Sequence, residues 1–145
     1  MGQSVKVWDL EQLAPVLLGV PVTGGYGEGE ILKLDHDEPS FTLKKGADGN
    51  VTRSKTYNGV MKVTLTLMQT SEYNAIFSTM LNIDKRGKNG AGIGPSAIKD
   101  LQGATLYFAS KSWIEGPPTA AFGREATHRE WTFIFADTEF FEGGN

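Results

Sequence analysis

The chain has 145 residues and a formal net charge of -3, with 39% hydrophobic and 21% charged residues. This composition is ordinary for a folded protein, and the length is sufficient for one domain with a single core. The acidic balance argues against a nucleic-acid-binding protein, which normally needs a basic patch to displace counterions from phosphates. The absence of cysteine excludes a disulfide framework, a thiolate metal site and a cysteine nucleophile.

The first part of the chain predicts short strands separated by turns. The run PVLLGVPV, at 15–22, leads into a glycine-rich segment at 23–30 that is typical of a turn or loop. Two further short strands are predicted at 31–37 and 39–45. The polar segment 46–59 contains two turn signals, DGN and NG. No apolar run near the amino terminus approaches the roughly 20 residues that span a bilayer, so we expect a soluble protein without membrane anchoring.

The clearest strand and the one convincing helix come next. In VMKVTLTLMQ, at 60–69, apolar residues alternate with Lys62, Thr64 and Thr66, which places one face in the core. From Tyr73 onward, apolar residues recur at i, i+3, i+4, i+7 and i+8. This spacing forms one apolar stripe on a helix that we expect at about 71–83.

The remaining sequence adds more strands and completes a mainly β pattern. The stretch AIKDLQGATLYFASKSWI predicts two strands joined by a turn at Gly103, and HREWTFIFAD predicts the last strand. Because that last strand is apolar on both faces around 133–135, we expect it at the centre of a sheet or buried by a partner. The sequence therefore predicts one domain over 1–145, an antiparallel β-barrel or sandwich of about seven or eight strands with one flanking α-helix.

Three groups of residues suggest chemistry, and each has a better structural explanation. The carboxylates around His36, at 35–38, are adjacent on a strand and point to opposite faces, so they cannot all meet one metal ion. His128 and Glu130 form a conceivable acid–base pair, but no nucleophile elbow accompanies them, which favours a surface or interface ion pair. The glycines of 23–30 lack the lysine and the following helix of a phosphate loop, which favours a hairpin turn.

Several aromatic side chains form a fourth candidate site, a stacking platform for a sugar or a base. Its members are Tyr57, Tyr107, Trp113 and Phe122. They lack the flanking Arg and Lys density of a nucleic-acid surface, so packing in a barrel or a subunit contact is favoured. We expect no enzyme activity, no catalytic residues, no metal and no cofactor.

Three long stretches carry a further signal. They are KGADGNVTRSKTYNGVMKVTLTLMQTSEYNAIF, GPSAIKDLQGATLYFASKSWIEGPP and FGREATHREWTFIFADTEFFEGGN. Together they resemble tail tube proteins of long-tailed bacteriophages, especially contractile-tailed ones, and the resemblance covers 19–145. It implies a compact barrel or sandwich, similar to the type VI secretion tube protein, with six copies in a ring. Stacked rings would form a hollow tube through which DNA passes during genome ejection without specific binding.

The resemblance also implies where copies of the chain meet. A loop at Lys44–Asn58 and terminal arms at Met1–Leu13 and Phe140–Asn145 would reach adjacent subunits or rings. The aromatic end of the chain is better buried between subunits than exposed to water. The residues that we expect at intersubunit or inter-ring contacts are Lys44, Asp48, Arg53, Lys55, Tyr57, Arg129, Trp131, Phe140 and Phe141.

The implied partners are other copies of the chain, a tail sheath, a baseplate hub, a tape-measure protein and a terminator. The implied location is the virion tail, after assembly in the host cytoplasm. Three alternatives remain open. They are a tube-like adaptor or baseplate ring, a small-ligand-binding β-barrel with Trp113 or Trp131 lining its cavity, and a hydrolase that uses His36 or His128.

Overall fold

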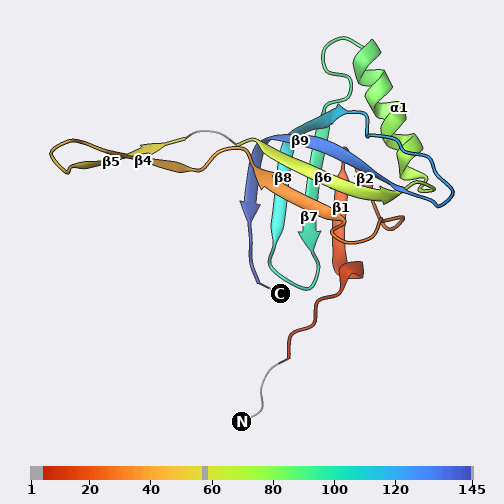
Figure 1. Cartoon of the computed structure of the whole chain (residues 1–145), viewed down its shortest axis with the longest axis horizontal. Helices are drawn as coiled ribbons and strands as arrows, with labels where there is room; N and C mark the ends of the chain where they lie inside the picture. The colour runs from red at the N-terminus through yellow and green to blue at the C-terminus, as the bar shows by residue number, and fades with distance from the viewer. Residues whose placement is uncertain (1–4, 57–58, 145) are drawn as a thin grey trace.

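The computed structural model describes residues 5–56 and 59–144, which form nine strands, one α-helix and a short 3-10 helix. Seven strands form one antiparallel sheet in the order β2-β1-β7-β8-β9-β6-β3, and β4 and β5 form a separate hairpin (Figure 1). The elements are η1 (Leu10–Gln12), β1 (Leu13–Leu17), β2 (Val20–Pro21), β3 (Leu32–His36), β4 (Phe41–Lys45), β5 (Val51–Lys55), β6 (Met61–Met68), α1 (Tyr73–Arg86), β7 (Gly94–Asp100), β8 (Leu106–Gly116) and β9 (His128–Phe141). The predicted mainly β class with a single flanking helix is confirmed.

The core is built on β6 and β9, which pair along their length from Met61 opposite Phe135 to Met68 opposite His128. The alternation predicted for β6 is observed, because all four of its alternating apolar side chains, from Met61 to Leu67, are fully buried. The last strand, β9, lies between β8 and β6 as expected. Only one of its faces is fully buried: Phe133 is in the core, whereas Ile134 on the other face is half-buried.

The helix α1 packs on this core through Phe77 and Leu81. The Phe77 ring lies 5.8 Å from the Trp131 ring and 5.1 Å from the Phe133 ring. The indole N–H of Trp131 donates a hydrogen bond of 2.9 Å to Asn74 Oδ1, which ties the first turn of the helix to β9. No helix in the described part of the chain has the length and apolar character needed to cross a membrane.

A chain of buried and part-buried hydrogen bonds closes the turn between β1 and β2. Leu18 has a left-handed backbone (φ 55°), and its N–H donates to Ser96 Oγ at 3.0 Å. The Ser96 and Ser112 hydroxyls are 2.6 Å apart, and Ser112 donates to the Gly94 carbonyl at 2.6 Å. Because the Ser112 proton is used on that carbonyl, Ser96 must be the donor between the two hydroxyls.

Candidate intersubunit surface

The β4–β5 hairpin projects far from the body of the protein (Figure 1). All ten residues of its two strands are exposed. Its turn is shaped by Asp48, whose carboxylate accepts hydrogen bonds from the Asn50 backbone N–H at 3.1 Å and from the Asn50 side-chain amide at 2.7 Å. Gly49 supplies a positive φ of 89°. The hairpin occupies most of the predicted loop, so that loop is an ordered two-stranded element, and Asp48 contributes to its turn.

The hairpin has two chemically different faces. One face carries three cross-strand pairs, which are Phe41 with Lys55, Leu43 with Arg53, and Lys45 with Val51. The opposite face carries Thr42, Lys44, Thr52 and Ser54. The Arg53 guanidinium lies 4.3 Å from the centre of the Phe41 ring, a cation–π contact on the first face. We call the face with Phe41 the apolar-basic face of the hairpin.

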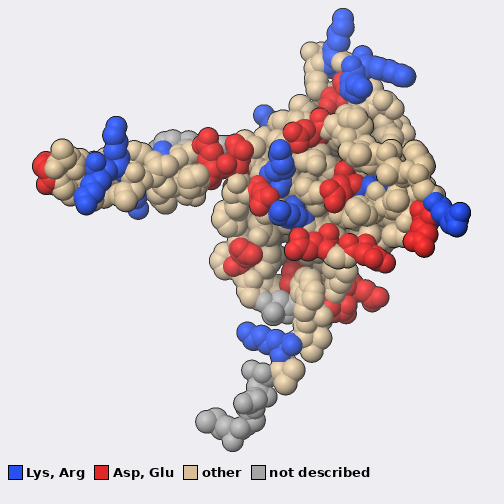
Figure 2. Space-filling view, viewed as in Figure 1, with Lys and Arg blue, Asp and Glu red and all other residues tan. Residues whose placement is uncertain are grey.

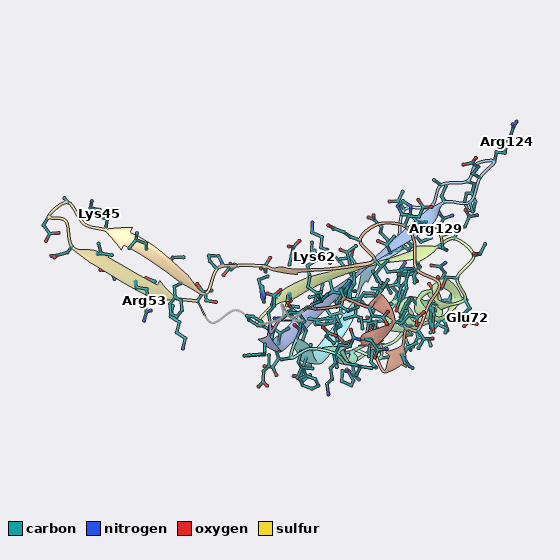
Figure 3. All side chains as sticks on the ribbon, turned by 90° about the horizontal axis from the view of Figure 1, so that it is seen from below. Lys45, Arg53, Lys62, Glu72, Arg124 and Arg129 are labelled. Carbon is teal, nitrogen blue, oxygen red and sulfur yellow. The ribbon has the colours of Figure 1, made fainter. Side chains whose placement is uncertain are left out.

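Charge is divided unevenly between the hairpin and the rest of the chain. Residues 41–55 contain four basic residues and one acidic residue, a net charge of +3. The whole chain has 14 basic and 17 acidic residues, which leaves 10 basic and 16 acidic residues elsewhere, a net charge of -6. Figure 2 shows basic side chains along the hairpin and acidic side chains gathered on the body. Lys45 and Arg53 lie far from the body in Figure 3. The hairpin is thus electrostatically complementary to other parts of the same chain.

The carboxyl-terminal aromatic residues lie on the surface at the end of β9. Phe140 is 53% exposed and Phe141 is 63% exposed. The Phe140 ring stacks on Tyr107 at 6.0 Å and lies 4.6 Å from the His36 ring. Both phenylalanines pair with β8, so the expected carboxyl-terminal arm begins inside a strand. The role of these residues in subunit contacts stays a prediction.

Two other expected contact residues have roles inside the chain. Trp131 is 1% exposed and belongs to the core. Arg129 is 7% exposed, and its guanidinium donates to Thr127 Oγ1 at 2.7 Å and to the Ala121 carbonyl at 3.2 Å. Arg129 also lies 5.1 Å from the Phe122 ring centre, so it anchors the connection that precedes β9. A contact between subunits through Arg129 or Trp131 stays a prediction. Tyr57 lies outside the described residues.

The candidate chemical groups form no common site among the residues that the structure describes. No cluster of three or more His, Asp or Glu side chains in that part of the chain could hold a metal ion. His128 Nε2 lies 3.7 Å from a Glu130 carboxylate oxygen on an exposed strand end, as the ion-pair interpretation requires. Gly25 and Gly29 in the glycine-rich segment have positive φ values of 72° and 79°, which fits a turn.

The members of the predicted aromatic platform have different partners. Tyr107 stacks on Phe140, Phe122 contacts Arg129, and Trp113 is half-buried in β8. Burial raises the pKa of the Tyr107 phenol above its usual value, and the nearby Glu142 carboxylate raises it further.

A groove with a volume of about 600 Å³ lies beside β1 and β2, from which the hairpin points away (Figure 1). We call it the β1–β2 groove. Its walls come from η1, β1, β2 and the segment that follows β2; the lining residues include Leu13, Pro15, Val22, Tyr26 and Leu101. The sequence reasoning missed this groove. The charge pattern could have drawn attention to this region, because four carboxylates and no basic residue occur between Lys6 and Lys33.

Comparison with known proteins places the chain among virus structural proteins. It is 31% identical over 121 residues to Structural protein ORF10 of Pseudomonas phage KPP10, an alignment that covers 83% of this chain and 70% of ORF10. The chain belongs to the family of this phage structural protein. No established family profile matches the sequence. The resemblance to phage proteins is thereby confirmed at the level of a phage structural protein, while a place in the tail tube stays a prediction.

Three solved structures share the fold of this chain. The cap that terminates the tube of the anti-feeding prophage has a TM-score of 0.59 and 11% identity, covering 97% of this chain and 95% of that chain. The sheath/tube terminator of an extracellular contractile injection system, PVC, has a TM-score of 0.58 and 10% identity, covering 97% and 100%. A chain of the PVC sheath-tube complex has a TM-score of 0.56 and 11% identity, covering 92% and 90%. At these identities the likeness establishes the fold alone.

Proposed function

We propose that this phage structural protein is a tail tube subunit. Six copies join side by side into a ring, and rings stack into a hollow tube in the virion tail, through which DNA passes without specific binding. The subunit has no catalytic role. It is assembled in the host cytoplasm, and its other partners are the sheath, the baseplate hub, the tape-measure protein and the terminator. The family supports a structural role, and the fold is shared with components of contractile injection systems.

The observation that carries this proposal is the exposed β4–β5 hairpin. Phe41, Leu43 and Val51 are 47%, 72% and 61% exposed on it. A two-stranded hairpin is marginally stable by itself in water and needs a further packing surface. In a stack of identical rings, the neighbouring ring would supply a packing surface to the hairpin of every copy except those at one end of the tube.

The ends of the seven-stranded sheet support lateral association. In the described residues, β2 and β3 are the end strands, and each pairs with one neighbour only. Sheet edges of this kind are templates for pairing with another chain. Closing a ring through these edges would pair their exposed backbone N–H and C=O groups and limit uncontrolled aggregation.

A tube-terminating ring is the second candidate, and two of the solved structures with this fold favour it. A terminator would form the same lateral contacts but would stop at one ring. The two functions therefore differ in whether identical rings stack on one another.

Negative-stain electron microscopy of the purified protein across a concentration series tests both candidates. A tube subunit should form hollow six-fold rings that extend into tubes as the concentration rises. A terminator should form single rings at every concentration. A protein that stays monomeric throughout, as judged by sedimentation velocity in the same samples, would contradict self-assembly and would favour the ligand-binding barrel.

A further inference from the structure

We propose that the β1–β2 groove of one copy is the docking site for the β4–β5 hairpin of another copy. This inference rests on the proposed function in one respect, namely that the chain associates with itself. It adds the acceptor surface for the hairpin. The argument has three steps, which concern the shape of the groove, its charge, and its position relative to the hairpin.

The groove is apolar and large enough for several side chains. Pro15 and Val22 form its buried floor, and Leu13 and Leu101 contribute apolar surface at its sides. Tyr26 also lines it, with its hydroxyl group donating to the Val22 carbonyl at 2.8 Å. Because that hydroxyl already has a partner, the Tyr26 ring offers an apolar wall. The groove thus suits apolar side chains such as Phe41, Leu43 and Val51 of the hairpin.

The segment of chain that supplies most of the groove is acidic. Glu11 lines the groove and is exposed. Asp9, Glu28 and Glu30 belong to the same segment, 7–32, which contains no basic residue. Figure 2 shows acidic side chains over the visible face of the body, including the half nearer the two chain ends. These carboxylates match the basic residues that accompany the apolar side chains on the apolar-basic face of the hairpin.

A hairpin cannot fill the groove of its own chain. The hairpin follows β3 at one end of the sheet, whereas the groove is built on β1 and β2 at the other end. In both Figure 1 and Figure 3 the hairpin points away from the strands that form the groove. Docking must therefore join two copies through two different surfaces. Such a head-to-tail contact leaves one hairpin and one groove unused in each pair of copies, so it can continue from copy to copy, either along a stack or around a closed ring. Because the sheet edges of β2 and β3 are assigned to the contact within a ring, we assign the hairpin–groove contact to the stacking of rings.

Disulfide cross-linking tests the contact directly, because the chain contains no cysteine of its own. Leu43→Cys, in the hairpin, is mixed with Leu101→Cys, at the groove, under mild oxidation. The two variants carry tags of different size, so that the mixed dimer is identified on a non-reducing gel. The matched control replaces Leu101→Cys with Ile83→Cys on α1, because the two native side chains are similarly exposed, at 58% and 52%.

The hairpin–groove mixture should give at least about tenfold more mixed dimer than the control, since a disulfide requires Cα atoms within about 7 Å. Equal yields from the two mixtures, or no mixed dimer in either, would overturn the assignment of the groove. Ring formation by the wild-type chain is measured in parallel. Rings together with unselective cross-linking would refute the groove alone, whereas the absence of any assembly would refute the proposed function as well.

A charge exchange provides an independent test. Lys45→Glu/Arg53→Glu reverses the hairpin, and Glu11→Lys/Glu28→Lys reverses the acidic side; all four native residues are exposed. Each variant alone places like charges across the contact, but a mixture restores opposite charges at every contact between the two different variants. We expect sedimenting stacks from the 1:1 mixture and none from either variant alone. Stacks from either variant alone, or none from the mixture when the wild type stacks, would contradict the proposal.

The controls for this exchange match the charge changes made in the hairpin. Lys85→Glu/Arg86→Glu on α1 matches the change of the hairpin variant, and both native residues are exposed. This control should stack like the wild type. Lys44→Glu, on the opposite face of the hairpin, should also weaken stacking less than Arg53→Glu. Equal effects of Lys44→Glu and Arg53→Glu would contradict docking through the apolar-basic face.

Discussion

Phe77 is the side chain through which α1 is held on the sheet, and its removal should have a large effect on stability. The ring is fully buried and contacts the Trp131 and Phe133 rings at 5.8 and 5.1 Å. Truncating a buried phenylalanine to alanine costs about 3–5 kcal/mol, which includes the cavity that is left behind. The two aromatic contacts argue against the lower end of this range for Phe77→Ala, since each such pair contributes about 0.5–1.5 kcal/mol beyond burial.

We therefore expect Phe77→Ala to lower the free energy of unfolding by about 4 kcal/mol. For a chain of this size that loss corresponds to a fall in Tm of about 8–16 °C. Urea denaturation monitored by tryptophan fluorescence measures the free energy, because Trp131 is in the same cluster. The control is Ile76→Ala, which removes a neighbouring side chain that is 36% exposed and should cost much less. Similar losses from the two variants would refute the assignment of Phe77 as the anchor of α1.

Two further predictions concern polar groups. Ser96→Ala should cost about 1–3 kcal/mol in urea denaturation, because it removes the buried hydrogen bond to Ser112 and leaves the part-buried Leu18 N–H without its acceptor; a loss no larger than that of an exposed serine variant such as Ser54→Ala would contradict this. The raised pKa of Tyr107 lies above that of the unfolded chain, so its stabilising contribution is complete below the unfolded pKa of about 10 and is lost as pH rises through the folded value. Glu142→Gln should shift the phenolate absorbance titration toward lower pH; an unchanged titration would rule out the carboxylate as a cause.

The sequence alone determined the elements whose side chains alternate between core and solvent. The period of two in β6 and the helical spacing from Tyr73 both report burial on one face, and the structure has a strand at Met61–Met68 and a helix at Tyr73–Arg86. The apolar character of both faces of β9 similarly indicated a central strand. These predictions succeeded because an element buried on one face needs apolar residues at a regular spacing, and that spacing is visible in the local sequence.

The tertiary structure alone decided the features that carry the functional proposals. Every residue of β5 is exposed, so the sequence has no burial pattern there to distinguish a strand from a loop. The β1–β2 groove brings Leu101 beside residues from 10 to 26, and local sequence does not specify which distant segments will meet. Arg129 was expected at a contact between copies of the chain, and in the structure its guanidinium donates to the Ala121 carbonyl and the Thr127 hydroxyl of its own chain. Hairpin, groove and buried arginine all depend on contacts between residues that only the folded backbone brings together.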